Sequence, residues 1–242
     1  MTPLFEGRRW WLVGASEGLG VAIAKQLDAE GASLILSARS EGKLRELAGG
    51  LRDARALPMD VTKAASVQQA VAEAGEVDGI VYCVGYYDPM AAPDWDPEEA
   101  AKMGEINFVG ALRLLGHVTP AMVGRGTGRI VLIGSLAGFA GLPGSIGYAA
   151  SKAGLMHLAE DMRADLKGTG VTVQRANPGF IRTRLTDKND FNMPQIMEPD
   201  EAAEHVMRAI RSGRFSTSFP RPFSWAFSVG GSLPTSLFQR LF

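Results

Sequence analysis

The stretch "RWWLVGASEGLG" at residues 9–20 decides the fold, because it joins an apolar run to a helix through a glycine-rich turn. Residues 9–14 predict a buried strand, and residues 19–30 predict the helix that follows. Glycines let backbone N–H groups approach a pyrophosphate, and the positive end of the helix dipole stabilises that anion. The turn therefore predicts a dinucleotide site with the candidate contacts Gly14, Ser16, Glu17, Gly18, Leu19 and Gly20. The spacing Gly-x3-Gly-x-Gly is not the commonest one for such a site, so a glycine-rich turn without a ligand stays the alternative.

The rest of the chain alternates short apolar runs with amphipathic stretches. Further strands are predicted at 33–38, 54–60, 79–85, 129–135 and 171–179. Helices are predicted at 42–51, 63–74, 97–123 and 148–167. Continuous apolar strands that alternate with helices indicate a parallel sheet covered on both faces. No linker interrupts the pattern, so we expect one domain over residues 1–220 and a separate apolar extension over 221–242.

Composition limits the classes of partner and compartment. The net charge is −1 and the isoelectric point is about 6.3, with no block of like charge, which argues against nucleic-acid binding. The single cysteine, Cys83, cannot form an internal disulfide and is typical of a reducing, cytoplasmic location. His117, His157 and His205 show no metal-ligand spacing, so no metal site is predicted. No segment before residue 220 is expected to span a bilayer.

The end of the second predicted strand indicates which dinucleotide binds. A carboxylate at this place would bind the 2′-hydroxyl of an NAD ribose. The sequence instead has Ala38, followed by Arg39 and Ser40. A guanidinium and a hydroxyl suit the 2′-phosphate of NADP(H), although an ordinary solvated arginine is the alternative.

Tyr148 and Lys152 form the main candidate for chemistry. They are four residues apart on a predicted helix, so their side chains share a face. A phenol has an ordinary pKa of about 10, and a neighbouring ammonium favours the phenolate and lowers that pKa. Tyr148 can then donate or accept a proton while a nicotinamide transfers hydride. The alternative is an i, i+4 pair on a surface helix without a role in chemistry.

In these motifs the sequence resembles the short-chain dehydrogenase/reductase family over about residues 8–212. The glycine turn fits the family's TGxxxGxG motif with Val13 in place of threonine, and "GYAASKAG" at 147–154 carries its Tyr-x3-Lys. The resemblance also assigns Asn107, Ser135, Asp60, Val61, Gly85, Pro178, Gly179, Ile181 and Thr183. One departure is clear, because the family's Asn-Asn-Ala-Gly reads Tyr82-Cys83-Val84-Gly85 here. That change puts the local stability of this turn in doubt more than the chemistry.

The resemblance implies a single-domain Rossmann-type fold, a doubly wound parallel sheet with flanking helices, and a homodimer or homotetramer. Tyr148 is implied as the proton donor or acceptor, Lys152 as a ligand of the nicotinamide ribose, and Ser135 as the group that binds the substrate oxygen. Asn107 is implied to hold a water that links Lys152 to solvent. The cofactor contacts implied besides the turn, Arg39 and Ser40 are Asp60, Val61, Gly85, Asn107, Tyr148, Lys152, Pro178, Gly179, Ile181 and Thr183.

The substrate is expected to be a small carbonyl compound or alcohol, reduced or oxidised with NADP(H). Loops at 86–95, 136–146 and 184–197 are expected to form its pocket, and their aromatic side chains favour an apolar molecule. Two other functions stay open. One is a non-catalytic NADP(H)-binding sensor or regulator, and the other is an NADP-dependent epimerase or dehydratase.

The C-terminal tail, which we define as residues 221–242, is rich in phenylalanine and leucine and has two charged residues, Arg221 and Arg240. Gly230, Gly231 and Pro234 argue against a spanning helix. A short amphipathic helix is predicted after Pro234, with Leu237, Phe238 and Leu241 on one side. We expect the tail to pack on its own domain or on a partner subunit. A lid on the substrate pocket or contact with a membrane surface are the alternatives, and the lid is preferred.

Overall fold

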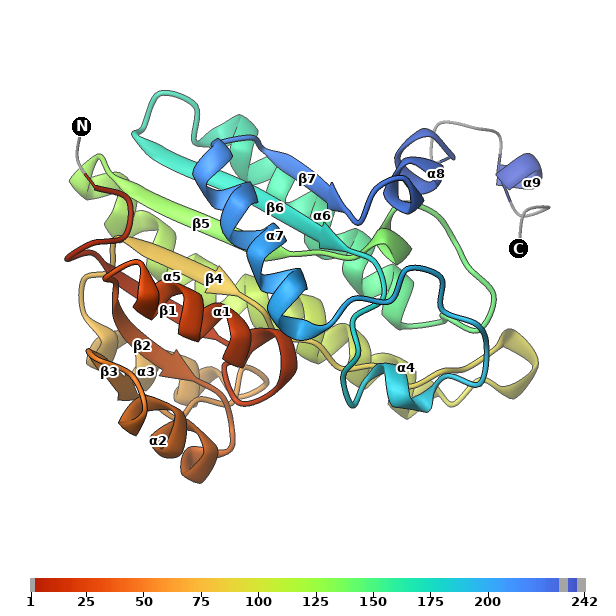
Figure 1. Ribbon diagram of the computed structural model, residues 1–242, viewed down its shortest axis with the longest axis horizontal. Helices are drawn as coiled ribbons and strands as arrows, with labels where there is room; N and C mark the ends of the chain where they lie inside the picture. Colours follow the sequence, from red (N-terminus) through yellow and green to blue (C-terminus); the bar gives the residue numbers. More distant parts are fainter. Residues whose placement is uncertain (1–2, 231–234, 239–242) are drawn as a thin grey trace.

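The computed structural model describes residues 3–230 and 235–238. Its centre is a parallel sheet of seven strands in the order β3-β2-β1-β4-β5-β6-β7 (Figure 1). The strands are β1 (Arg9–Val13), β2 (Ser33–Ser37), β3 (Ala54–Ala56), β4 (Gly79–Tyr82), β5 (Gly128–Ile133), β6 (Val171–Pro178) and β7 (Ser216–Phe219). This arrangement confirms the predicted Rossmann-type α/β fold.

Helices cover both faces of the sheet. They are α1 (Gly18–Ala29), α2 (Glu41–Gly49), α3 (Ala64–Ala74), α4 (Pro97–Gly104), α5 (Gly110–Arg125), α6 (Tyr148–Asp165), α7 (Pro199–Ser212), α8 (Phe223–Gly230) and α9 (Thr235–Phe238). Helices α1, α2 and α7 lie on one face, and α3, α5 and α6 lie on the other (Figure 1). The pleat of β1 divides the core accordingly, because Trp10 points into the first layer and Trp11 into the second.

The order of the strands fixes the place of a ligand site. The chain starts at β1 in the middle of the sheet, runs outward to β3, and returns to β4 on the other side of β1. Crossovers that leave in opposite directions from β1 and β4 open a crevice at the carboxyl ends of these strands. The glycine turn follows β1 at this point, and Gly14 lies so close to Cys83 that an added Cβ would be 2.8 Å from the Cys83 carbonyl.

The long predicted helix at 97–123 is interrupted. It begins at α4, where the Asp96 side chain accepts hydrogen bonds from the N–H groups of Glu98 and Glu99 at 3.0 and 3.1 Å. A π-helical segment, Glu105–Val109, then connects α4 to α5. By length and composition alone, Pro97–Arg125 could cross a membrane, contrary to the sequence expectation. Of its most apolar window, 44% is buried in the protein, and one helix that passes this test of length and composition is weak evidence for a membrane span.

Helix α7 and strand β7 are not among the elements predicted from the sequence. The signal for α7 is nonetheless present, because Pro199 opens it, acidic residues follow in its first turn, and one side is buried. Strand β7 has no apolar run, and it is a strand because Ser216–Phe219 pairs with Arg175–Pro178 of β6. In the tail, the predicted short helix is found as α9. Helix α8 precedes it and was not predicted from the sequence. Leu241 lies outside the described residues.

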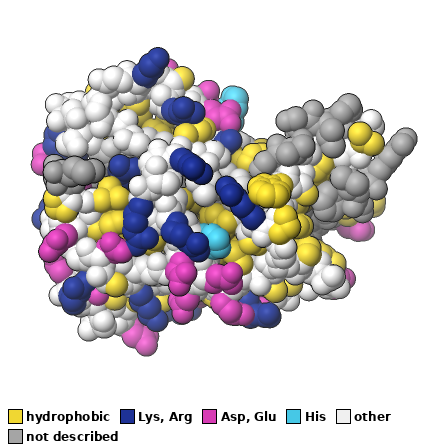
Figure 2. Space-filling view, turned by 45° about the horizontal axis from the view of Figure 1, so that its top comes forward, with side chains coloured by type: hydrophobic (Ala, Val, Ile, Leu, Met, Phe, Trp, Pro, Cys, Tyr) yellow, Lys and Arg dark blue, Asp and Glu magenta, His cyan; other side chains and the backbone are white. Residues whose placement is uncertain are grey.

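The surface carries both signs of charge. On the face in Figure 2, Lys and Arg are interspersed with Asp and Glu, and apolar side chains gather beside the C-terminal helices. The exposed large apolar residues of the described chain are Trp95, Leu112, Val123, Phe191, Trp225 and Leu237.

Candidate active site

A cavity of about 930 Å³ opens at the carboxyl ends of the central strands. It brings together nearly all residues that the sequence singles out. Those that line it are Gly14, Ser16, Glu17, Gly18, Leu19, Gly20, Arg39, Ser40, Asp60, Val61, Gly85, Ser135, Tyr148, Lys152, Pro178, Gly179, Ile181 and Thr183. Asn107 is fully buried and lies outside the lining. Lys43 also lines the cavity and was missed, because a lysine at a helix start gives no sequence signal of its own, while Arg184 and Lys188 lie in the loop at 184–197 that the sequence assigns to the substrate pocket.

The glycine turn is built so that side chains cannot occupy it. Gly14 and Gly18 have φ values of +94° and +50°, which favour glycine. A Cβ on Gly20 would lie 2.0 Å from the Gly14 carbonyl oxygen, so the first turn of α1 is in contact with the end of β1. Because the turn has no side chains at these glycines, a pyrophosphate has room against the N-terminus of α1, where the helix dipole favours an anion.

Positive charge gathers where the second strand reaches the cavity. Arg39 is followed by Ser40, and Lys43 lies in the first turn of α2. The Lys43 ammonium forms an ion pair with Glu17, and Arg184 contacts the other oxygen of the same carboxylate at 3.1 Å. The hydrogen bond from Lys43, together with the Arg184 charge, holds the pKa of Glu17 below its usual value. Glu17 therefore connects the glycine turn to α2 and to the loop after β6.

Asp60 lies beside this cluster in a fixed orientation. Its Oδ1 accepts hydrogen bonds from the Thr62 N–H at 3.0 Å and the Thr62 hydroxyl at 2.7 Å. Burial on its own would raise the pKa of Asp60, but these bonds outweigh it and the pKa is lowered. The carboxylate is therefore ionised and oriented.

Ser135, Tyr148 and Lys152 converge at the other end of the cavity. The Ser135 Oγ accepts a hydrogen bond from the Ala137 N–H at 3.1 Å, which leaves its own proton for the Tyr148 phenol or a substrate. Lys152 is 3% exposed, and its Nζ donates to the carbonyls of Val84 and Ile133, both at 3.1 Å. The Lys152 Nζ lies 6.0 Å from the centre of the Tyr148 ring.

The electrostatics of this trio differ from the sequence expectation. Burial raises the pKa of Tyr148, and the hydrogen bond with Ser135 offsets this only in part. Burial also lowers the pKa of Lys152 to about 8. The ammonium was expected to lower the pKa of Tyr148, but the loss of hydration on burial is the largest effect and the pKa is raised.

Asn107 braces the backbone beside the cavity. Its Oδ1 accepts from the Tyr86 N–H at 2.7 Å, and its Nδ2 donates to the Tyr86 carbonyl at 2.8 Å and to the Ser151 hydroxyl at 2.9 Å. The resemblance implies that Asn107 holds a water next to Lys152. The structure instead engages the side chain with Tyr86 and Ser151.

Tyr82, Cys83 and Val84, which depart from the family's motif, are accommodated by local contacts. The Tyr82 hydroxyl donates to the Ile106 carbonyl at 2.9 Å, so this phenol ties β4 to the π-helical segment. Burial raises the pKa of the Cys83 thiol to about 12, so the thiol stays protonated at neutral pH.

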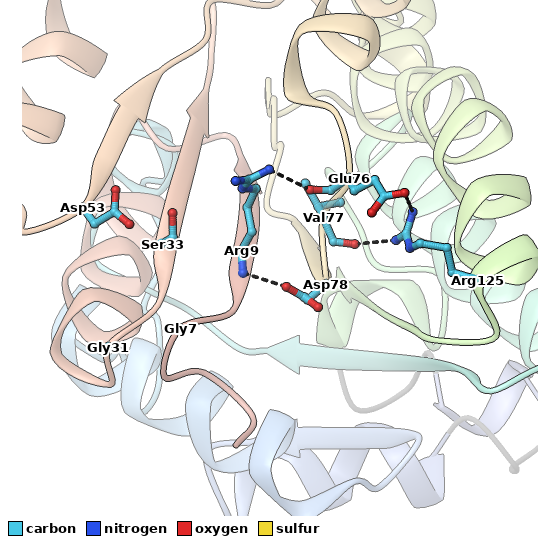
Figure 3. Close-up of a pocket in the computed structure, with 9 residues that line it drawn as sticks. All are labelled: Gly7, Arg9, Gly31, Ser33, Asp53, Glu76, Val77, Asp78 and Arg125. Carbon is cyan, nitrogen blue, oxygen red and sulfur yellow. Dashed lines mark hydrogen bonds and ion pairs between the residues drawn. The ribbon is translucent and has the colours of Figure 1, made fainter. Parts of the chain in front are cut away.

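A second cavity of about 430 Å³ lies at the opposite, amino-terminal edge of the sheet (Figure 3). Several of its polar groups are paired with one another. Arg9 donates to the Glu76 carbonyl and to the Asp78 carboxylate, and Arg125 donates to the Val77 carbonyl (Figure 3). Ligands of open parallel sheets bind at the carboxyl ends of strands, so the larger cavity is the candidate site. Within residues 3–230 and 235–238, no group of three or more His, Cys, Asp or Glu could hold a metal ion.

Comparison with known proteins places this geometry in a family. The sequence profile of the short chain dehydrogenases matches residues 10–193. An uncharacterized oxidoreductase of Myxococcus xanthus is 35% identical over 94% of this chain and 93% of its own length. The 3-oxoacyl-[acyl-carrier-protein] reductase of Salmonella typhimurium is 35% identical over 75% of this chain and 77% of its own. A short-chain dehydrogenase from Sphingobium yanoikuyae, solved in complex with NADPH, superposes with a TM-score of 0.84 at 27% identity and covers 93% of each chain.

The profile covers most of the chain, and it spans both the glycine turn and the Tyr148–Lys152 pair. The expected resemblance is therefore confirmed: this chain is an oxidoreductase of the short-chain dehydrogenase/reductase family.

Proposed function

We propose that this protein transfers hydride between NADP(H) and a small carbonyl or alcohol substrate, with Tyr148 as the proton donor or acceptor. The observation that carries this proposal is the shared cavity. One continuous space of about 930 Å³ has the glycine turn and Arg39 at one end and Ser135, Tyr148 and Lys152 at the other. A dinucleotide would lie along this space, with its phosphates at the glycine turn and its nicotinamide ring at Ser135, Tyr148 and Lys152.

The residues present fit this cofactor. The glycine turn leaves the α1 N-terminus open to a pyrophosphate, and Arg39 and Ser40 would hold the 2′-phosphate. Asp60 and Val61 would flank the adenine, and the remaining contacts would lie at the nicotinamide end, at Gly85, Lys152, Pro178, Gly179, Ile181 and Thr183. The bound nicotinamide supplies or accepts the hydride, and the protein supplies orientation and the proton.

Proton transfer falls to Tyr148. Because burial raises its pKa, the phenol is protonated at neutral pH and can donate its proton to a carbonyl oxygen during reduction. The Ser135 hydroxyl would hydrogen-bond the same oxygen as negative charge develops on it. The Lys152 ammonium, held by two carbonyl groups, keeps a positive charge beside the site that favours phenolate after the transfer.

A turnover assay tests the proposal against its alternatives. NADPH would be mixed with a panel of aldehydes, ketones and 3-oxoacyl thioesters, the last because the Salmonella typhimurium relative is named for that class. Consumption of NADPH with any of them supports the oxidoreductase. Tight NADPH binding without turnover of any compound would favour a sensor or regulator. Product formation without net change in NADPH would favour an epimerase or dehydratase.

Arg39 should set the choice of cofactor. Charge-assisted hydrogen bonds contribute about 1.5–3 kcal/mol, so NADPH is expected to bind roughly ten- to a hundredfold more tightly than NADH. Arg39→Ala should remove most of this preference, and titration of both cofactors measures it. Arg45→Ala is the matched control, because Arg45 is exposed on α2 and pairs with Glu41. Equal binding of the two cofactors by the unaltered protein would contradict the assignment.

We also propose a cytoplasmic homodimer or homotetramer. Leu112 and Val123 on α5 are 41% and 38% exposed, and covering them in a partner contact would remove apolar surface from water. Size-exclusion chromatography with light scattering tests the assembly. A monomer at micromolar concentration would contradict it.

The tail is proposed to support the substrate pocket. Its buried residues Phe227 and Phe238 form a small cluster with Leu136, which is 2% exposed and adjoins Ser135. Phe223 also lies near Gly179, since a Cβ there would be 3.4 Å from the Phe223 ring. The tail thus packs on the loop after β5, which the sequence expects to form part of the substrate pocket.

Removing this support is expected to destabilise the domain while NADPH still binds. Phe227→Ala should lower the free energy of unfolding by about 3 kcal/mol, the lower end of the range for a buried phenylalanine. Deletion of residues 221–242 should lower solubility or change the oligomeric state, because Leu136 is then uncovered. Thermal unfolding, size-exclusion chromatography and NADPH titration measure these effects.

Trp225→Ala is the matched control, because Trp225 is 56% exposed on the same helix and should change the stability little. If Phe227→Ala were as stable as Trp225→Ala, the tail would not support this loop. Co-sedimentation of the full chain with liposomes would instead favour the membrane alternative.

A further inference from the structure

Tyr87 lies against the proton donor without a role in the scheme above. It follows β4 in the loop at 86–95, and its side chain is buried, with 9% of the residue exposed. The ring centres of Tyr87 and Tyr148 are 5.0 Å apart and the rings are inclined by 70°, an edge-to-face contact. Contacts of this geometry favour one relative orientation of two aromatic rings. The ring of Tyr87 therefore restricts how Tyr148 can tilt, and it covers one side of the phenol.

Two consecutive residues from the other side of the cavity mouth hold Tyr87 in place. The Tyr87 hydroxyl donates to Asn189 Oδ1 at 2.9 Å. Lys188 Nζ donates to the Tyr87 carbonyl at 3.0 Å and to Asp88 Oδ1 at 2.9 Å. We call this set of bonds the clasp. It connects the loop after β4 to the loop between β6 and α7, so Tyr87 is fixed at both its backbone and its hydroxyl.

The clasp is in turn anchored at the cofactor end of the cavity. Thr186, two residues before Lys188, accepts a hydrogen bond from the Thr183 N–H at 2.9 Å. The Thr186 hydroxyl lies 2.8 Å from both the Ile181 and Thr183 carbonyls, to which it donates. Residues 181–183 include Ile181 and Thr183, which are proposed above as contacts at the nicotinamide end of the cofactor. The Asn189 N–H donates to the Thr186 carbonyl at 3.1 Å, so a continuous set of hydrogen bonds runs from that turn through Thr186 and Asn189 to Tyr87.

We propose that Tyr87 is a positioning residue for Tyr148, and that the clasp of Lys188 and Asn189 holds its ring against the phenol. This inference rests on the proposed function, in which Tyr148 transfers the proton. Proton transfer requires the hydroxyl within hydrogen-bond reach of the substrate oxygen, and small displacements from that geometry reduce the rate. The ring also excludes water from one side of the phenol. Tyr87 itself touches no reacting atom in this scheme.

Graded substitutions at Tyr87 test the proposal by steady-state kinetics. Tyr87→Leu removes the ring contact and is expected to lower kcat about tenfold, the upper end for an aromatic pair. Tyr87→Phe keeps the ring and loses only the bond to Asn189, so it should recover most of that loss. Substrate KM and the NADPH dissociation constant should change by less than about twofold in both, because the contact acts on orientation and not on binding.

The bond to Asn189 has its own test. Asn189→Ala should match Tyr87→Phe in kcat, and the double variant should be no worse than either, because both remove the same hydrogen bond. Asn192→Ala is the matched control, since Asn192 is exposed on the same loop. Additive losses in the double variant would contradict the clasp. If Tyr87→Leu does not fold, Tyr87→Phe and Asn189→Ala still test the proposal.

A titration of tyrosinate absorbance tests the same contact without turnover. The difference between the protein and Tyr148→Phe reports Tyr148 alone, and the same difference is taken in the Tyr87→Leu background. Groups facing Tyr148 include Cys83 and Lys152, which both backgrounds keep, while Tyr87 itself faces Asp88 and Asp190. Because burial raises the pKa of Tyr148, removing the covering ring should lower it.

The two readouts separate this proposal from the proposed function. A lowered pKa of Tyr148 in a protein that reduces no compound of the panel would keep the contact of Tyr87 with Tyr148 and reject the proposed carbonyl substrates. Normal kcat and an unchanged pKa in Tyr87→Leu would reject the positioning role and leave the proposed function intact. A rise in KM at unchanged kcat would show that Tyr87 binds substrate instead.

Discussion

Tyr148→Phe is expected to lose on the order of 10²-fold or more in the rate of carbonyl reduction, the usual size of a general-acid contribution. The substitution removes one oxygen atom from a group that lines the cavity beside Ser135 and Lys152. The ring and its contact with Tyr87 remain, so the fold and the NADPH dissociation constant should stay close to those of the unaltered protein. Single-turnover kinetics with saturating NADPH measure the loss at the chemical step.

Tyr82→Phe is the matched control for this result. Tyr82 is also a buried tyrosine, but its hydroxyl donates to the Ile106 carbonyl and lies outside the cavity lining. Its loss should cost about 0.5–1.5 kcal/mol of stability and leave the rate unchanged. The two variants should therefore show opposite patterns in rate and in stability. Activity of Tyr148→Phe within a few-fold of the unaltered protein would end the assignment of Tyr148.

The fold could be predicted from the sequence where local patterns decide it. Apolar runs identify β1, β2, β4, β5 and β6, and the glycine turn identifies the strand from which the sheet is wound. The signal for β3 is weaker, and only Ala54–Ala56 of the predicted 54–60 is a strand. Strand β7 could not be found this way, because "STSF" is a strand only through its pairing with β6. The π-helical segment Glu105–Val109 was missed for a related reason, since a change in helical hydrogen bonding leaves no change in apolar periodicity.

The site was predictable as a set of residues but not as an arrangement. Motifs at strand ends identify the lining, since parallel strands bring their carboxyl ends to one edge. The contact between Tyr87 and Tyr148 and the clasp depend on loops that meet only in the folded chain. The sequence also could not predict which effect decides the pKa of Tyr148 and of Lys152. Sequence spacing shows that Lys152 shares a face with Tyr148, but it does not show how much water either group loses on burial.

Gly20→Ala is expected to weaken NADPH binding roughly tenfold or more and to destabilise the fold by about 1–3 kcal/mol, the usual cost of overpacking. In most helices alanine is more stable than glycine by about 0.5–1 kcal/mol. At Gly20 the added Cβ would lie 2.0 Å from the Gly14 carbonyl oxygen and 3.1 Å from the Ala15 Cα. Both atoms belong to backbone, so α1 itself must move away from the end of β1, and the anion site moves with it.

Gly42→Ala is the matched control, because it makes the same change near the start of α2, where a Cβ would meet nothing within 4 Å. It should be neutral or stabilise the protein by about 0.5–1 kcal/mol and leave NADPH binding unchanged. Thermal unfolding with and without NADPH, followed by a cofactor titration, separates the two variants. The glycine turn is the feature that ties the sequence to the cofactor. If Gly20→Ala bound NADPH as tightly as Gly42→Ala does, the pyrophosphate would not lie against the first turn of α1.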